Sequence, residues 1–258
     1  MKNEPNSHIK VKIRNLYFPI KVRSKDHYNG EKTIANISID SAIELAYGGE
    51  FAKKIIQVIS SRNESIGIYQ LTKEIMDYCN SINAEKTSIS YEYPYFINNM
   101  SFKSNNKIKK CFCQFSAEKD LLFEYKRKHQ VTVPVTMYHA LLSFLEDPLD
   151  SPIEIVVEFE GDDIIFTEDI VEIVEGSISK IIGCNSIGEF ADKGMSTNNF
   201  KLRLLNNIRD TLISKHNISN CSVKAVNQQA LYLFSVETIK SAEKMGLSGL
   251  KKIEQALN

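Results

Sequence analysis

Hydrophobic residues in the first half of the chain follow two periods. They alternate with polar residues within 10–23 and again within 31–40, which is the period of a strand with one buried face. The segment between them, 24–30, ends in Asn-Gly, a dipeptide typical of hairpin turns. Helical spacing and then strand alternation follow, which predicts two helices and two further strands at residues 51–60, 69–81, 87–95 and 108–116.

The second half repeats this order of elements. Two alternating stretches come first, then two with helical spacing, then two more that alternate, in residues 129–137, 153–160, 167–182, about 199–215, 220–226 and 229–236. We therefore predict an α+β fold of two β-β-α-α-β-β units that share one antiparallel sheet, with the helices on one face. Residues 1–258 are interpreted as a single domain with two similar halves, about 10–117 and 129–236, and an appended amphipathic C-terminal helix at 237–256.

Antiparallel hairpins leave unpaired edges, which other chains can cover by pairing edge to edge. We therefore expect a homo-oligomer, either a dimer or a tetramer. The 32 basic and 32 acidic residues cancel, which argues against nucleic acid or a membrane surface as the partner. Neither a long apolar run nor a secretory signal is found, so we expect a cytoplasmic protein in which all five cysteines are reduced.

Two of these cysteines, Cys111 and Cys113, are close together. The alternation around Phe112 predicts a strand in which both sulfur atoms lie on the same face. A metal site is the weaker interpretation of this pair, because no third or fourth ligand is spaced nearby. The basic cluster at 126–129 is interpreted as a charged strand edge that discourages aggregation, and a phosphate-binding role is the alternative.

Several segments resemble one enzyme family when they are taken in order. They are Val131-Thr-Val-Pro-Val-Thr136, the helical Thr167-Glu-Asp-Ile-Val-Glu-Ile-Val-Glu175, the opening strand from Ile13 to Val22, and Tyr93-Pro-Tyr-Phe-Ile97. Together they are similar to segments of the type IB GTP cyclohydrolases, and the resemblance covers roughly residues 11 to 236. It implies the tunnelling fold (T-fold), in which subunits close into a barrel, and a hydrolytic opening of the guanine ring on the way to folate and pterins.

The resemblance also implies a metal site, which this sequence does not preserve. The family holds a divalent metal (Zn, Mn or Fe) through a Cys, a His and a Glu, because a bound metal supplies hydroxide near neutral pH. The family's Cys falls on His139 or on its neighbour Tyr138, and its distal Glu falls near Glu189. The family's His-Asn-Gln-Arg motif should fall near residues 150–152, where no His is present. A divalent metal is therefore a doubtful cofactor.

Three residues remain as candidates for the site. His139 and Glu189 are the candidate catalytic residues and metal ligands, and Glu175 is the candidate contact to a purine. Each also has a simpler interpretation: His139 as a partly buried helix residue, Glu189 as a solvated loop carboxylate, and Glu175 as part of an acidic helix face. In that interpretation the acidic face also includes Glu168 and Glu172, and Glu168 complements the helix dipole.

Two functional hypotheses follow. The first is a GTP cyclohydrolase-like hydrolase that acts on or binds GTP, or a related purine nucleotide or pterin, through a remodelled or degraded metal site. The second is a catalytically inactive T-fold paralogue that serves as a binding or assembly module. Because most of the family's catalytic residues are missing, enzymatic activity is left open.

Overall fold

The computed structural model describes most of the chain. The described residues are 8–25, 27, 29–61, 66, 68–98, 108–119, 125–135, 153–161, 165–183, 197–227 and 233–237. The predicted C-terminal helix at 237–256 lies outside them, apart from its first residue. No described helix is long and apolar enough to cross a membrane.

Eight strands form one antiparallel sheet in the order of the sequence, from β1 at one edge to β8 at the other. Every strand therefore pairs with its neighbours along the chain, and β4 and β5 join the two halves of the sheet. The strands are β1 (His8–Val22), β2 (Glu31–Glu44), β3 (Ala84–Asn98), β4 (Ile108–Lys119), β5 (Tyr125–Val135), β6 (Ile153–Gly161), β7 (Ile218–Asn227) and β8 (Leu233–Glu237).

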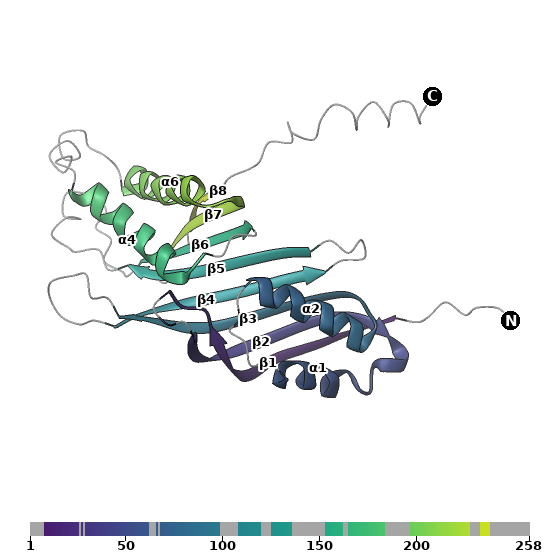
Figure 1. Cartoon of the computed structure of the whole chain (residues 1–258). Helices are drawn as coiled ribbons and strands as arrows, with labels where there is room; N and C mark the ends of the chain where they lie inside the picture. Colours follow the sequence, from purple (N-terminus) through teal and green to yellow (C-terminus); the bar gives the residue numbers. More distant parts are fainter. Residues whose placement is uncertain are drawn as a thin grey trace, which may run out of the picture.

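The helices come in two pairs, one after β2 and one after β6, and they cover the same face of the sheet (Figure 1). The first pair follows a short 3-10 turn, η1 (Leu45–Tyr47). Within the described residues the helices are α1 (Phe51–Ser60), α2 (Ile68–Ile82), α4 (Thr167–Gly183) and α6 (Thr197–Lys215). The predicted α+β architecture with an antiparallel sheet is confirmed by this arrangement.

The core lies between the helices and the sheet. Alternate strand residues such as Ile37, Ile89 and Ile155 are fully buried there, and they pack with helix residues such as Ile55 and Ile208 in one continuous cluster. Successive side chains of a strand point to opposite faces, so the strand residues that alternate with these buried ones lie on the opposite surface of the sheet, which we call the helix-free face. Most of its side chains are half-buried or exposed.

The turn between β1 and β2 shows how local sequence sets the sheet. Gly30 adopts a φ of 72°, a conformation that glycine reaches without steric cost, and its N–H donates to the His27 carbonyl at 2.8 Å. The pairing of β1 with β2 then shifts register between Ile13 and Leu16, where Asn15 has a φ of 56°. This irregularity is a bulge, which bends the edge strand.

Two sequence interpretations are corrected by the structure. The basic segment at 126–129 does not lie at a strand edge: β5 is central, between β4 and β6, and His129 is fully buried. The sequence pattern missed this because all four residues of the segment are basic, and only the burial of His129 shows that the strand is central. Glu168 is not on a solvated face either. It is 9% exposed, because the turn after β1 packs over the start of α4.

Candidate functional site

The helix-free face carries two neighbouring rows of side chains that run across the strands. In the first row Asn36, Glu92, Gln114 and Gln130 are successive register partners on β2 to β5. In the second row Pro94 pairs with Phe112 and Phe112 with Thr132, and Ile34 lies two residues from Asn36 on β2. A mainly apolar row thus lies directly beside a polar one.

A hollow of about 330 Å³ opens on this face, over β1 to β5. It is lined by both rows, with Tyr17 of β1 at one side, and the lining residues are Tyr17, Ile34, Asn36, Glu92, Tyr93, Pro94, Phe112, Cys113, Gln114, Gln130 and Thr132. Several of its apolar side chains are well exposed: Tyr17 is 68% exposed, Ile34 60% and Phe112 50%. Exposed apolar groups gathered around a few polar ones are typical of a ligand-binding surface.

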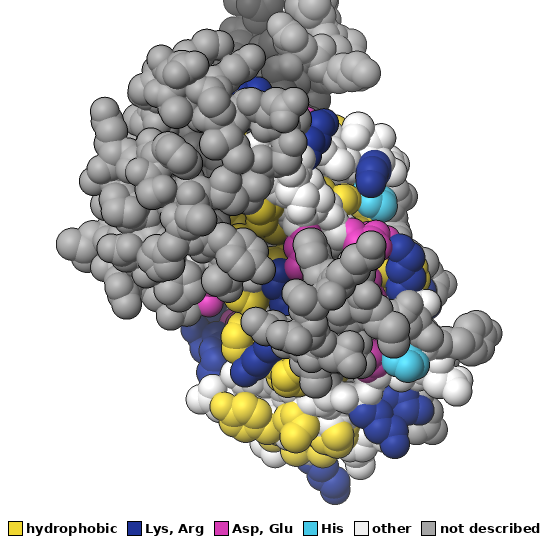
Figure 2. Space-filling model, turned by 90° about the vertical axis from the view of Figure 1, so that its left-hand side faces the viewer, with side chains coloured by type: hydrophobic (Ala, Val, Ile, Leu, Met, Phe, Trp, Pro, Cys, Tyr) yellow, Lys and Arg dark blue, Asp and Glu magenta, His cyan; other side chains and the backbone are white. Residues whose placement is uncertain are grey.

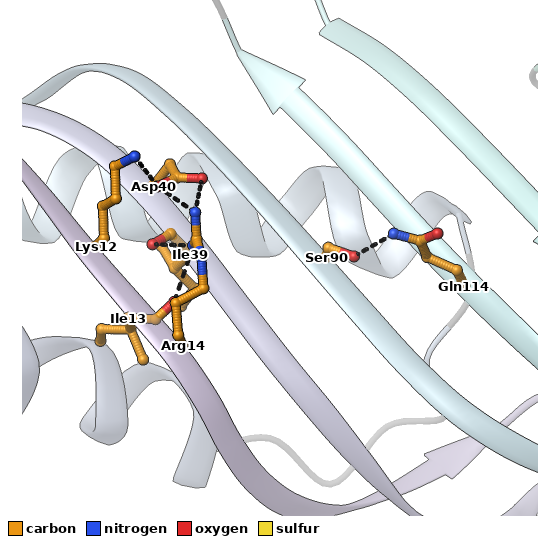
Figure 3. Close-up of polar contacts among 7 residues, drawn as sticks. All are labelled: Lys12, Ile13, Arg14, Ile39, Asp40, Ser90 and Gln114. Atoms are coloured by element: carbon orange, nitrogen blue, oxygen red, sulfur yellow. Dashed lines mark hydrogen bonds and ion pairs between the residues drawn. The ribbon is translucent and has the colours of Figure 1, made fainter.

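Figure 3 shows polar contacts on strands β1 to β4, and of the residues drawn Gln114 lines the hollow. Gln114 donates from Nε2 to Ser90 Oγ at 2.8 Å, across β4 and β3. On the β1–β2 side, Arg14 donates from Nη2 to both carboxylate oxygens of Asp40 at 2.8 and 2.7 Å, and Lys12 lies 3.9 Å from the same carboxylate. The Asp40 carboxylate is thus paired with both cations drawn there.

The wider surface mixes charges in a similar way. Figure 2 shows one side of the molecule, on which lysine and arginine side chains are interspersed with acidic and hydrophobic ones. This is the distribution expected of a chain whose 32 basic and 32 acidic residues cancel.

Of the three predicted site residues, only Glu175 is among the described ones. It lies in α4 and accepts a hydrogen bond and ion pair from Lys109 Nζ of β4 at 2.5 Å, with both side chains 20% exposed. Next to them, burial raises the pKa of the Cys111 thiol to about 11, while the Lys109 charge opposes this shift. Glu175 is thus placed against the sheet and already holds a cation. His139 and Glu189 lie outside the described residues.

Cys111 and Cys113 lie on the same face of β4, as predicted, and both are buried as free thiols. Cys113 Sγ lies 3.6 Å from Thr167 Oγ1, and burial raises the pKa of its thiol well above the usual range. Among the described residues no three His, Cys, Asp or Glu side chains are grouped so that they could hold a metal.

The start of α4 holds a buried carboxylate with several hydrogen-bond donors, that of Glu168. Oε1 of Glu168 accepts from Ser24 Oγ at 2.9 Å, from the Lys25 backbone N–H at 2.9 Å and from Tyr95 Oη at 2.6 Å. Lys25 Nζ also pairs with Asp169 at 2.6 Å. This network connects the turn after β1 with the second half of the chain, and sequence spacing provides no signal for it.

His129 is the second buried polar group that sequence reasoning missed. Its ring stacks on Phe115 at a centroid distance of 4.0 Å and meets the edge of Phe159 at 4.9 Å. Neither ring nitrogen has a hydrogen-bond partner within the described part of the chain, and burial lowers the pKa of the imidazole from 6.5 to about 3. His129 is therefore a neutral core residue.

Comparisons with known proteins agree with the resemblance at a coarse level. No protein-family model matches the chain. A GTP cyclohydrolase FolE2 from Caldicellulosiruptor bescii is 27% identical over 176 residues, and the match spans 66% of this chain and 66% of that protein, just under two thirds of its length. The chain is thus distantly similar in sequence to this GTP cyclohydrolase.

A structural comparison supports the fold. A hyper-thermostable AgUricase mutant matches with a TM-score of 0.54 at 6% identity, over 94% of this chain and 96% of that one. At this identity the likeness concerns the fold alone. Uricase is a tunnelling-fold protein, so the mixed α/β structure with its antiparallel sheet is consistent with that fold.

Proposed function

We propose that this chain is a GTP cyclohydrolase-like tunnelling-fold protein that binds GTP or a related purine or pterin, with a remodelled or degraded metal site. The observation that carries the proposal is the match to GTP cyclohydrolase FolE2 over 176 residues. The motif order along the sequence is in line with this match, and the uricase-like arrangement of sheet and helices supports the fold.

In this proposal the two halves are similar β-β-α-α-β-β units, and the molecule works as a dimer or tetramer. The element order supports the first point, because each half has two strands, two helices and two strands. The open sheet supports the second, because among the described strands β1 and β8 each pair with another strand on one side only, apart from a single bridge between Val22 and Ile66. Pairing between subunits would cover these edges and close a barrel.

Any metal would be held by His139 and Glu189, which stand at the family's ligand positions. A catalytic metal needs three protein ligands and an open position, and the sequence has no His where the family's second ligand falls, near 150–152. We therefore derive no reaction step through a metal.

The second hypothesis, a catalytically inactive paralogue that binds a ligand or assembles with a partner, is favoured by one specific observation. Glu175, the candidate purine contact, is engaged by Lys109 at 2.5 Å. A carboxylate that already holds a cation is a weaker acceptor for the N–H groups of a purine, because the Lys109 charge offsets its own and occupies part of its acceptor capacity.

A titration of the protein with GTP separates these hypotheses, when it is combined with metal analysis and a turnover assay. For a remodelled enzyme, His139→Ala and Glu189→Ala should remove both bound metal and turnover, while GTP binding persists. For an inactive paralogue, neither metal nor turnover should be detected in the unaltered protein, and GTP or a pterin should still bind.

The contact to the purine is tested by Glu175→Gln, with Glu172→Gln as its control. Glu172 lies one turn earlier on α4 and its side chain is 75% exposed. A loss of GTP affinity in the Glu175 variant alone would support the assignment. Equal affinity in both variants would remove Glu175 from the site, and binding of neither GTP nor a pterin by the unaltered protein would contradict the proposed function.

A further inference from the structure

The hollow on the helix-free face contains a carboxylate without a partner. Glu92 lines it, and no described residue forms an ion pair or hydrogen bond with its side chain. Other acids on this face are neutralised: Asp40 by Arg14, Glu118 by Lys86 at 2.5 Å, and Glu158 by Lys128 at 2.7 Å. The negative charge at Glu92 is therefore available to a cation from outside.

A second acceptor lies beside it. The Oδ1 atom of Asn36 is buried and has no donor among the described residues. Asn36 and Glu92 are register partners on β2 and β3, so their Cβ atoms are roughly 5 Å apart on the same face. A buried acceptor without a donor is costly, so an N–H group that reaches Asn36 Oδ1 from the hollow would be favourable.

The rest of the hollow is suited to a flat or apolar body. Ile34, Pro94 and Phe112 form its apolar row, and Tyr17 lies at its β1 side. The volume of about 330 Å³ is at the lower end of small-molecule sites. Aromatic faces such as those of Tyr17 and Phe112 also attract cations.

We propose that the hollow binds a small molecule with a planar amidinium or guanidinium head on a flat, apolar body. The two parallel N–H donors of such a head match a carboxylate in bidentate fashion, and its remaining N–H can reach a neighbouring acceptor. Glu92 pairs with the charged head, Asn36 Oδ1 accepts a hydrogen bond from the remaining N–H, and the apolar body lies along Pro94 and Phe112. This inference is independent of the proposed purine or pterin function.

Benzamidine is the simplest probe of this chemistry, and benzamide is its neutral counterpart of the same shape. Isothermal titration at low salt should detect benzamidine binding to the full chain, with benzamide at least about tenfold weaker. Glu92→Gln should weaken benzamidine by about tenfold or more and leave benzamide unchanged, because only the charge-assisted part of the binding is lost. Glu118→Gln is the matched control, because it removes one carboxylate charge from the same face and should leave the affinity unchanged.

Asn36→Leu tests the second acceptor and should also weaken benzamidine, with the thermal unfolding temperature measured to confirm that each variant is folded. Equal binding of benzamidine and benzamide, equal loss in the Glu92 and Glu118 variants, or no benzamidine binding at millimolar concentration would each overturn the proposal. If a side chain of a second copy fills the hollow instead, benzamidine will not bind and Glu92→Gln will reduce the oligomer mass in light scattering. That result would overturn the proposal as well.

Discussion

The buried histidine of β5 makes the stability of this protein depend on pH. His129 is fully buried and has no hydrogen-bond partner among the described residues, and its pKa is about 3 in the folded chain against 6.5 in the unfolded one. Between these two values the unfolded state binds a proton that the folded state does not. The contribution to stability is therefore complete above pH 6.5 and is lost progressively as the pH falls toward 3.

The size of the effect follows from the shift. From pH 7 to pH 5, protonation of the unfolded imidazole lowers the free energy of unfolding by about 2 kcal/mol. His129→Leu removes the titrating group and the two unpaired ring nitrogens while it keeps a similar volume. The pH-dependent loss of stability should then be smaller by about 2 kcal/mol in the variant than in the unaltered protein.

Urea unfolding followed by circular dichroism at pH 7 and pH 5 measures this difference. Effects of the substitution that do not depend on pH cancel when the two pH values are compared, and so do the other titrating groups. His216→Gln, at a half-buried position beyond α6, is the matched single-imidazole substitution measured alongside it. If the unaltered protein and His129→Leu lost stability in parallel, within about 0.5 kcal/mol, the imidazole would be protonated or hydrogen-bonded in the folded state.

Three further predictions concern packing and assembly. Glu168→Ala should lower the free energy of unfolding in urea by about 3 kcal/mol, because three donors lose one acceptor. The control Glu172→Ala should change that free energy by less than about 0.5 kcal/mol, and equal effects of the two substitutions would contradict the network. Ellman's reagent at pH 8 should react slowly with Cys111 and Cys221 in the native protein, because burial raises the pKa of both thiols to about 11, and it should react with all five cysteines once the protein is denatured. Rapid labelling of Cys111 or Cys221 in the native protein would argue against that burial. Light scattering should give a mass of two or four chains, and a 29.4 kDa monomer would refute edge pairing.

The order of elements was predictable because each strand and helix has one buried face. The α1 boundaries at 51–60 agree with the prediction to the residue, since Phe51, Ile55 and Ile59 are all buried. Strand ends were less accurate: β3 extends from 84 to 98 where alternation indicated 87–95. Pairing with a neighbouring strand can extend a strand beyond its own hydrophobic pattern. The residues that determine this extension belong to the neighbouring strand, which lies elsewhere in the sequence.

The site was much less predictable than the fold. Glu175 was singled out by its depth in the helix, but its engagement by Lys109 depends on which strand lies beneath α4, and local sequence does not state this. The hollow around Asn36 and Glu92 depends on register across four strand pairs. A single-sequence pattern reports which residues share a face of one strand, and it does not report which residues of different strands lie side by side.

The Glu168 network also bears on how the chain folds. All strand pairs of the sheet join sequence neighbours, so each hairpin of the first half has its pairing partners before the second half is formed. The turn after β1 differs, because Ser24 and Lys25 bond to a carboxylate 144 and 143 residues away. The Lys25 amide should therefore gain protection from hydrogen exchange only when α4 has docked, which makes it a reporter of cooperative unfolding between the two halves.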